Sequence, residues 1–316
     1  MISSSIEPIL KTPKLSILIS VYGQLALTKR CLSALHHSIG DKISYEVLLV
    51  DDASDDGTPQ FLQTLNSVHR CFYNSSNLGF AKNNNRMAKE ARGEYLLFLN
   101  NDAFVSGDWL NPMLRVFEIH QDVGFVGNVQ KLDGSKRFDH MGVVFGPAGN
   151  PRHYGQGYFH NPFKGEVIQW SAVTAACALV KRSTFLEVGG FDEDFINGCE
   201  DVELCVRMSK FGLSHYVAHD SVIDHVKGAS RGRKKYNQQN FEILMRKCGK
   251  FIENYQSVLD QKRHAHTYFL RAFLRPQSVN FFKFLEAALI YFGLKKLPPS
   301  APQKSFATLQ YSQNRS

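Results

Sequence analysis

The chain has 316 residues, 43% of them hydrophobic and 21% charged, which is typical of a folded protein with one large domain and a smaller appendage. The N-terminus lacks a basic-then-apolar leader and no uncharged apolar stretch is long enough to span a bilayer, so neither a secreted nor an integral membrane protein is expected. We therefore predict a cytoplasmic protein whose six cysteines are buried free thiols rather than disulfide or zinc ligands.

The net charge of +8 is distributed unevenly along the chain. Residues 225–316 contain 17 Lys and Arg against 4 Asp and Glu, a formal charge of +13, whereas the residues before them carry −5. A mildly acidic body with a basic end favours contact of that end with anions, such as phospholipid, a phosphorylated carrier or nucleic acid.

The N-terminal part of the chain predicts strands that alternate with helices. Short apolar runs indicate buried strands, and apolar residues at helical spacing indicate the helices between them. The predicted strands are 15–21, 45–50, 70–73 and 95–99, and the predicted helices are 24–39, 58–65 and 79–91. This alternation indicates a mostly parallel sheet with helices on both faces, in which ligands bind beyond the carboxyl ends of the strands.

The rest of the chain has weaker periodicity. Residues 124–164, rich in Gly, Pro and aromatics, predict loops and short strands of a second, mixed sheet, and 168–180 is apolar and β-prone. A basic, glycine-containing loop is expected at 228–235. The predicted helices in this part are 200–211, 241–254 and 264–274, and the Pro/Ser/Gln-rich residues 298–316 are expected to be disordered.

Polar residues follow two of the predicted strands. Asp51 and Asp52 are placed to accept hydrogen bonds from a base or a ribose, or they form an acidic turn before a helix. Asn100 and Asp102 follow the next strong strand. They offer oxygen ligands to a cation that neutralises a diphosphate leaving group, or they form a polar turn.

A third acidic group opens the predicted helix 200–211. Glu200, Asp201 and Glu203 repel one another unless a cation or a catalytic task holds them together, and one of them is suited to act as general base toward an acceptor hydroxyl. The alternative is an acidic first turn that the helix dipole favours.

These groups belong to motifs that, taken together and in order, resemble the family 2 glycosyltransferases, which have the GT-A fold. The resemblance covers about residues 15–230, and the motifs are SILISVYG (16–23), VDDASDDGT (50–58), NLGFAKNNN (77–85), LNND (99–102), and GGFDE (189–193) with NGCEDVELCVR (197–207). The resemblance implies an α/β fold with a Rossmann-like, mostly parallel sheet flanked by helices, a small second sheet and a C-terminal helical extension.

The resemblance also implies a division of the chain. We expect an N-terminal tail (1–14), a GT-A glycosyltransferase domain (15–227), a basic loop with the helical extension (228–297) and the disordered tail (298–316). The implied activity is inverting transfer of a hexosyl or deoxyhexosyl group from a nucleotide-diphosphate sugar to a hydroxyl of a glycan or lipid-linked glycan, assisted by Mn²⁺ or Mg²⁺. Surface polysaccharide biosynthesis, with rhamnosyltransferases among the similar enzymes, is the expected setting.

Residue roles follow at the matching positions. Asp201 is the implied general base with Glu200 beside it, and Asp102 and His225 are the implied metal ligands. Trp170 and Glu203 are the candidate acceptor contacts, with a core position as the alternative for Trp170. Ser230, Arg231 and Arg233 form a candidate lid over the diphosphate, or a solvated loop. The implied nucleotide-sugar contacts are Ser20, Tyr22, Asp51, Asp52, Asn77, Gly79, Asn85, Asn100, Asn101 and Asp102.

Four positions depart from the family pattern. Ser20 stands where Pro is usual, Gly23 where Asn is usual and Ala175 where Gly is common. Asn100 replaces an Asp that many relatives carry, which predicts weaker metal binding. None of these changes removes the carboxylates of Asp102 and Asp201.

The segment 281–297 contains aromatics and leucines flanked by lysines. Such a segment is suited to lie in a membrane interface, here the inner face of the plasma membrane, or to pack on the body or in a dimer contact. A non-catalytic scaffold or glycan-binding module is the alternative function. The positive residues match no nucleic-acid-binding pattern, so nucleic acid is not expected as a partner.

Overall fold

A computed structural model describes residues 12–40, 43–226, 228, 233–274, 277 and 279–295. Most of the predicted N-terminal tail, all of the predicted tail 298–316, and the basic-loop residues Ser230 and Arg231 lie outside these ranges. The backbone of Arg233 is described, but its side chain is not.

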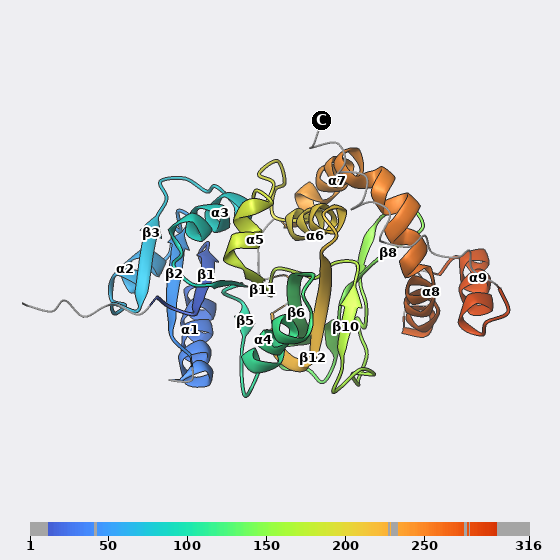
Figure 1. Ribbon diagram of the computed structural model, residues 1–316, viewed down its shortest axis with the longest axis horizontal. Helices are drawn as coiled ribbons and strands as arrows, with labels where there is room; N and C mark the ends of the chain where they lie inside the picture. Colours follow the sequence, from blue (N-terminus) through green and yellow to red (C-terminus); the bar gives the residue numbers. More distant parts are fainter. Residues whose placement is uncertain are drawn as a thin grey trace, which may run out of the picture.

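A mixed sheet forms the centre of the described structure (Figure 1). The strands β4, β1, β2 and β3 are parallel neighbours. β11 is antiparallel to both β4 and β6, and β6 and β12 are parallel to each other. The sheet order is β10-β12-β6-β11-β4-β1-β2-β3, with β5 paired to β12 and β7 paired to β6. The bounds are β1 (Leu15–Val21), β2 (Tyr45–Asp51), β3 (His69–Tyr73), β4 (Tyr95–Leu99), β5 (Ala103–Phe104), β6 (Val123–Leu132), β7 (Phe138–His140), β10 (Val167–Trp170), β11 (Cys177–Lys181) and β12 (Ser214–His225).

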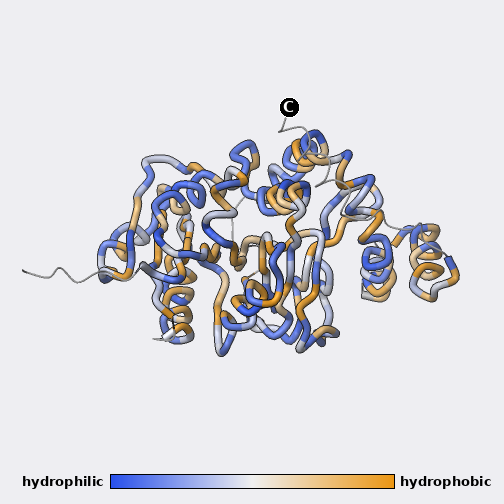
Figure 2. Tube along the Cα trace, viewed as in Figure 1, coloured by the Kyte–Doolittle hydropathy of each residue, from blue (hydrophilic) through white to orange (hydrophobic). Residues whose placement is uncertain are grey.

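Helices cover both faces of this sheet. Leu18 of β1 packs in one apolar cluster with α3, α5 and α6, whereas Ile17 and Ile19 pack in a second cluster with α1 and α4. The strand is therefore buried on both faces, which explains why it is mostly apolar (Figure 2). The bounds are α1 (Leu25–Ile39), α2 (Thr58–Gln63), α3 (Phe80–Glu90), α4 (Leu110–Ile119), α5 (Arg182–Glu187) and α6 (Glu200–Lys210).

A two-stranded antiparallel sheet, β8 (Val143–Phe145) with β9 (Pro151–His153), connects the main sheet to the C-terminal helices. Asp260 of α8 accepts a hydrogen bond of 2.7 Å from the backbone N–H of Phe145 in β8. α9 packs on α8 around Ala265 and Ile290, and the two helices form one end of the molecule (Figure 1). These helices are α7 (Asn237–Phe251), a π-helical turn (Ile252–Gln256), α8 (Ser257–Leu274) and α9 (Phe281–Tyr291).

The predicted fold class is confirmed, with one correction inside it. Residues 124–164 were expected to form short strands of a second sheet, but β6 is a long strand within the main sheet. The strand β6 was not predicted because its apolar run is interrupted by Gly124 and Gly127 and by the buried Asn128 and Gln130. The strand β12 and the helix α4 were also not predicted.

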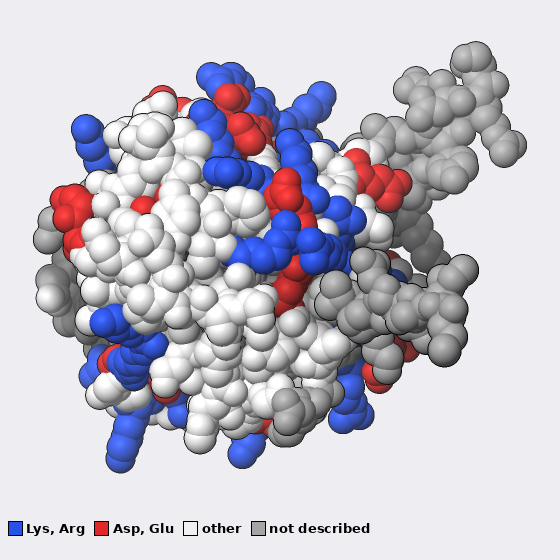
Figure 3. Space-filling view, turned by 90° about the vertical axis from the view of Figure 1, so that its left-hand side faces the viewer, with Lys and Arg blue, Asp and Glu red and all other residues white. Residues whose placement is uncertain are grey.

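No disulfide links any of the six cysteines, all of which lie within the described ranges; four are buried, and Cys71 and Cys199 are half-buried, so the predicted burial holds for four of the six. Figure 3 shows positive and negative side chains intermingled on the end of the molecule opposite α9. Among the ion pairs of the structure, Arg70 contacts both Glu46 and Glu90, at 3.3 and 3.1 Å.

Candidate active site

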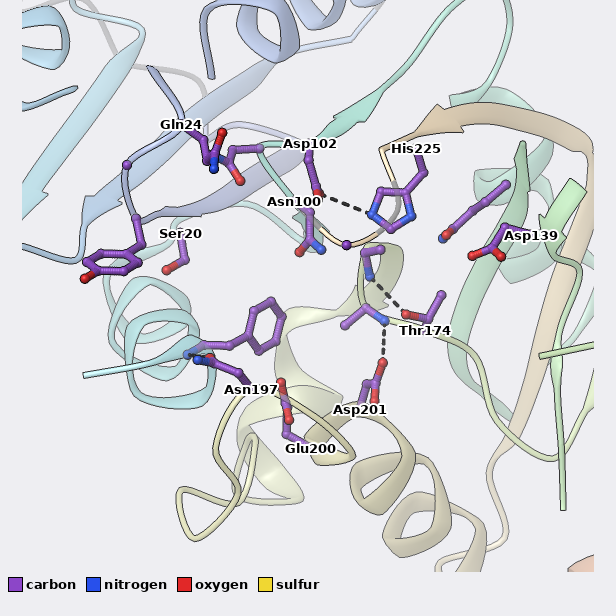
Figure 4. A pocket seen from close by; sticks show the side chains of 18 of the residues that line it. Ser20, Gln24, Asn100, Asp102, Asp139, Thr174, Asn197, Glu200, Asp201 and His225 are labelled. Carbon is purple, nitrogen blue, oxygen red and sulfur yellow. Dashed lines mark hydrogen bonds and ion pairs between the residues drawn. The ribbon is translucent and has the colours of Figure 1, made fainter. Parts of the chain in front are cut away.

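A cleft of about 1630 Å³ opens beyond the carboxyl ends of β1, β2 and β4 (Figure 4). In Figure 4 the side chains of Asn100, Asp102 and His225 lie on one side of the cleft, and Glu200 and Asp201 lie across from them. The predicted site residues that line this cleft are Ser20, Tyr22, Asp52, Asn77, Asn100, Asn101, Asp102, Glu200, Asp201 and His225.

Asp102 and His225 are brought together by strand pairing. The two residues of β5 follow Asp102 directly and pair antiparallel with the end of β12, so that Ala103 lies opposite His225. His225 Nε2 then lies 3.2 Å from Asp102 Oδ1, with both residues more than nine-tenths buried. The Nδ1 atom of His225 is buried and has no hydrogen-bond partner among the described residues.

The donor set of this pair fits a divalent cation. Mg²⁺ and Mn²⁺ often take only one or two ligands from a protein, such as a carboxylate or an imidazole, and further oxygens from a substrate diphosphate. Within the part of the chain that the structure describes, no group of three or more His, Cys, Asp or Glu is arranged to hold a metal by itself. A cation at this place would find one carboxylate and one imidazole on the chain and would need further ligands from elsewhere.

Asp201 is held at the start of α6 by two backbone amides. Its Oδ2 atom accepts a hydrogen bond of 3.0 Å from Ala175 N–H, and its Oδ1 atom accepts one of 2.8 Å from Val202 N–H. Glu200 is buried beside it and accepts a hydrogen bond from Gly198 N–H. The carboxylates of Glu200 and Asp201 both line the cleft.

Asp52 organises the loop before α3. It accepts hydrogen bonds from the backbone N–H groups of Leu78 and Gly79, at 2.8 and 2.9 Å, and from the Asn74 amide at 2.8 Å. Gly79 has a φ of 84°, a conformation that a residue with a side chain rarely adopts. The neighbouring Asp51 does not line the cleft, but its Oδ1 atom is buried without a hydrogen-bond partner among the described residues.

Three other predicted site residues have packing roles. Asn85 bonds the backbone N–H and C=O of Phe191, and Glu203 forms two hydrogen bonds with Arg207. Trp170 is buried in an aromatic cluster beneath the guanidinium of Arg263, which lies 4.2 Å from the ring centroid. None of the three lines the cleft, so their predicted contacts with a ligand have no support in the structure.

The wall of the cleft contributed by β7, β9 and α8 was missed by the sequence analysis. Asp139 is buried there, accepts a hydrogen bond of 3.0 Å from the Gln156 amide and lies 3.8 Å from His153. The cleft is also lined by Arg152, Thr267 and Arg271. Two residues of the predicted basic loop, Gly228 and Lys235, line it as well. Residues 124–164 carry no periodic signal, so nothing in the sequence singled out this wall.

Comparison with solved structures shows the fold. A crystal structure of GalNAc-T7 with UDP, GalNAc and Mn²⁺ superposes with a TM-score of 0.62, at 16% identity, over 92% of this chain and 60% of that one. Residues 16–189, more than half of the chain, match the sequence model of Glycosyl transferase family 2. The chain therefore belongs to the family 2 glycosyltransferases.

Two characterised bacterial proteins are similar to the chain in sequence. The O-antigen biosynthesis protein RfbC of Myxococcus xanthus is 36% identical over 155 residues, which are 47% of this chain but only 12% of that protein. An N-acetylglucosaminyl-diphospho-decaprenol L-rhamnosyltransferase of Mycobacterium tuberculosis is 28% identical over 228 residues, 65% of this chain and 73% of that enzyme. Among the described residues, no helix is both long and apolar enough to cross a bilayer.

Proposed function

We propose that the protein transfers a sugar from a nucleotide-diphosphate donor to an acceptor hydroxyl with inversion at the anomeric carbon. The observation that carries this proposal is the arrangement of Asp102 and His225 on one side of a single cleft and Asp201 across from them (Figure 4). This arrangement leaves space between a diphosphate-binding group and a general base, which an inverting displacement requires.

The nucleoside is proposed to lie against Tyr22, Asp51 and Asp52. Tyr22 is 54% exposed at the rim of the cleft, so its ring is available to a base. The unpartnered oxygen of Asp51 is suited to accept a hydrogen bond from a base N–H. Both carboxylate oxygens of Asp52 accept hydrogen bonds from the loop before α3. We therefore propose that Asp52 fixes the conformation of the loop that borders the nucleoside.

The reaction then requires removal of one proton and stabilisation of one leaving group. Asp201 accepts the proton of the acceptor hydroxyl while the oxygen attacks the anomeric carbon, which has oxocarbenium character as the bond to the diphosphate breaks. A divalent cation, when held by Asp102 and His225, supplies positive charge for the departing diphosphate. The amide of Ala175 keeps the Asp201 carboxylate directed into the cleft.

Donor binding tests this proposal directly. Calorimetric titration of a panel of nucleotide sugars into wild-type protein and Asp102→Asn, with Mn²⁺, Mg²⁺ or EDTA, should give metal-dependent binding of one donor that the variant weakens at least tenfold, or about 1.4 kcal/mol. Hydrolysis of the same donor, followed by release of the nucleoside diphosphate, is the activity readout. Failure of every donor to bind under every metal condition would favour the scaffold or glycan-binding alternative.

The acceptor is proposed to be a glycan or lipid-linked glycan of a surface polysaccharide. Similarity to the O-antigen biosynthesis protein RfbC and to the N-acetylglucosaminyl-diphospho-decaprenol L-rhamnosyltransferase supports this setting. The 15–227 and 228–297 units are proposed as the catalytic domain and its extension, respectively, although α8 of the extension contributes to the wall of the cleft.

We also propose that α9 rests on an anionic membrane surface, at the cytoplasmic face predicted from the sequence. Phe281, Phe282 and Leu285 are 68%, 78% and 48% exposed, and Lys283 lies among them. Flotation with vesicles of phosphatidylglycerol and phosphatidylcholine should recover the wild-type protein but not the Phe281→Ser/Phe282→Ser variant. Ile119→Ser, at an apolar residue of α4 that is 61% exposed, is the control, and equal flotation of all three proteins would refute the proposal.

A further inference from the structure

The cleft continues past the proposed reaction centre to a wall that is rich in positive charge. Arg152 of β9 and Arg271 of α8 both line this part, and Thr267 lies one helical turn before Arg271 on the same face of α8. Arg271 is outside residues 16–189, which match the family sequence model. The wall thus combines Arg152, which lies inside the matched region, with Arg271 of the C-terminal extension.

Within the described ranges, no carboxylate pairs with either arginine. Neither forms an ion pair with any residue that the structure describes. Burial and the positive charge of nearby Arg271 lower the pKa of Arg152. When the Asn150 side-chain amide is turned over so that its oxygen faces the guanidinium, that oxygen accepts hydrogen bonds from Arg152 Nε and Nη2, at 2.9 and 3.2 Å. Arg152 is thus held in place beside a like charge.

Of the surrounding groups, His264 has a pKa lowered to about 4 by burial and by the charges of Arg152 and Lys283, so it is uncharged at neutral pH. Asp139, on the same wall, accepts a hydrogen bond from Gln156 and lies beside His153. Guanidiniums that line one cleft are stabilised when an anion binds to them, and a phosphate matches their planar donors.

The position of this wall separates it from the donor. In Figure 4, Asp139 lies beyond His225, on the side away from Ser20 and Gln24, and His153 beside it is the neighbour of Arg152 in β9. Asp102 and His225 lie between the two ends of the cleft (Figure 4). A donor with its nucleoside at Tyr22 and its diphosphate at Asp102 leaves the arginines for a different phosphate.

We propose that Arg152 and Arg271 bind a phosphate of the acceptor, which is a sugar joined through a phosphate or diphosphate to a lipid carrier. This proposal rests on the proposed glycosyltransferase function and assigns the acceptor class of the same cleft. The lipid leaves the cleft toward α9, which packs on α8 and where Phe281 and Phe282 are 68% and 78% exposed. The arginines position the acceptor and take no part in bond formation.

The test uses farnesyl phosphate as a short probe of the lipid phosphate. The full-length protein is first saturated with Mg²⁺ and the nucleoside diphosphate of its donor, and the probe is then titrated calorimetrically below its micellar concentration. We expect binding to the wild-type protein that is weakened at least tenfold, or by about 1.4 kcal/mol, in Arg152→Gln/Arg271→Gln. Farnesol should bind weakly to both proteins, and Arg152→Lys/Arg271→Lys should restore part of the affinity because it restores the charge.

Control measurements separate the remaining explanations. Arg246→Gln, at an exposed arginine of α7, should bind the probe like the wild-type protein, and all variants should bind nucleotide and melt like the wild-type protein. Loss of probe binding on addition of nucleotide would assign the arginines to the donor diphosphate and overturn the proposal. Equal affinity for inorganic phosphate and farnesyl phosphate would overturn it in favour of a free anion. Failure of nucleotide binding itself is a separate result, which would refute the proposed function and, with it, the acceptor assignment.

Discussion

The Asp201 carboxylate accepts a hydrogen bond of 3.0 Å from the backbone N–H of Ala175, a residue 26 positions earlier in the chain. Ala175 lies in the segment between β10 and β11, so this bond joins the start of α6 to the centre of the sheet. The side chain is thereby held toward the cleft.

Asp201→Asn should remove the general base with little effect on the fold. An amide oxygen can still accept from Ala175 N–H, but it cannot take a proton from the acceptor, so we expect kcat to fall by about 10²–10⁴-fold. Donor affinity and melting temperature should stay close to the wild-type values. Retention of full kcat would assign the base to another group, with Glu200 as the first candidate.

Asp260 should make the stability of the fold depend on pH. Burial raises its pKa to about 6, so the folded protein binds a proton that the unfolded chain releases at lower pH. The stability from this proton is complete below pH 4 and is lost as the pH rises through 6, a change of about 3 kcal/mol. Urea unfolding of wild type and Asp260→Asn at pH 4.5 and 7 should show the variant gaining relative stability at the higher pH. A difference between the two proteins that is independent of pH would contradict this assignment.

Glu203 and Arg207 should contribute to stability more than a surface ion pair does. Glu203 is 4% exposed and receives two hydrogen bonds from Arg207, which also donates to the carbonyls of Val188 and Gly190. Arg207→Met leaves a buried carboxylate without its partner, which is expected to destabilise the protein by about 3 kcal/mol.

The matched control for this pair is Lys295→Met, because Lys295 pairs with Glu286 at the surface, where both side chains are about half exposed. Its expected effect is below about 1 kcal/mol. Chemical denaturation of the two variants provides the comparison. Equal destabilisation would show that burial does not distinguish the two pairs.

Gly190 is a position where even a small side chain should be poorly tolerated. Its φ is 71°, and a Cβ atom would lie 2.5 Å from Oδ1 of Asn85. Gly190→Ala should therefore break the contact of Asn85 with Phe191 and destabilise the protein by about 2–3 kcal/mol. Gly107→Ala, with a φ of 62° and open space around the position, should show only the backbone effect of about 1 kcal/mol. Similar losses in the two variants would exclude the steric contribution.

Sequence reasoning located the half of the site that lies on parallel strands. Asp52 and Asp102 follow buried strands, and the carboxyl ends of parallel strands meet at one edge, so their position followed from periodicity alone. The wall with Asp139 and Arg152 was beyond that reasoning because short antiparallel strands with buried polar residues have no period. Arg271 was not predicted for a different reason. The helix that contains it was predicted in part, but the sequence does not show which face of this helix turns toward the cleft, because that depends on packing against β8.

The pairing of β5 with β12 has a consequence for folding. Asp102 and His225 are 123 residues apart and meet only after the last strand of the main sheet has been added. A ligand that needs both residues cannot bind a partly folded chain. Because it binds only the folded protein, its binding stabilises the folded state by mass action. Substitutions that weaken the attachment of β12 should therefore lower apparent affinity even when they lie far from the cleft, and saturating nucleotide and cation should rescue them.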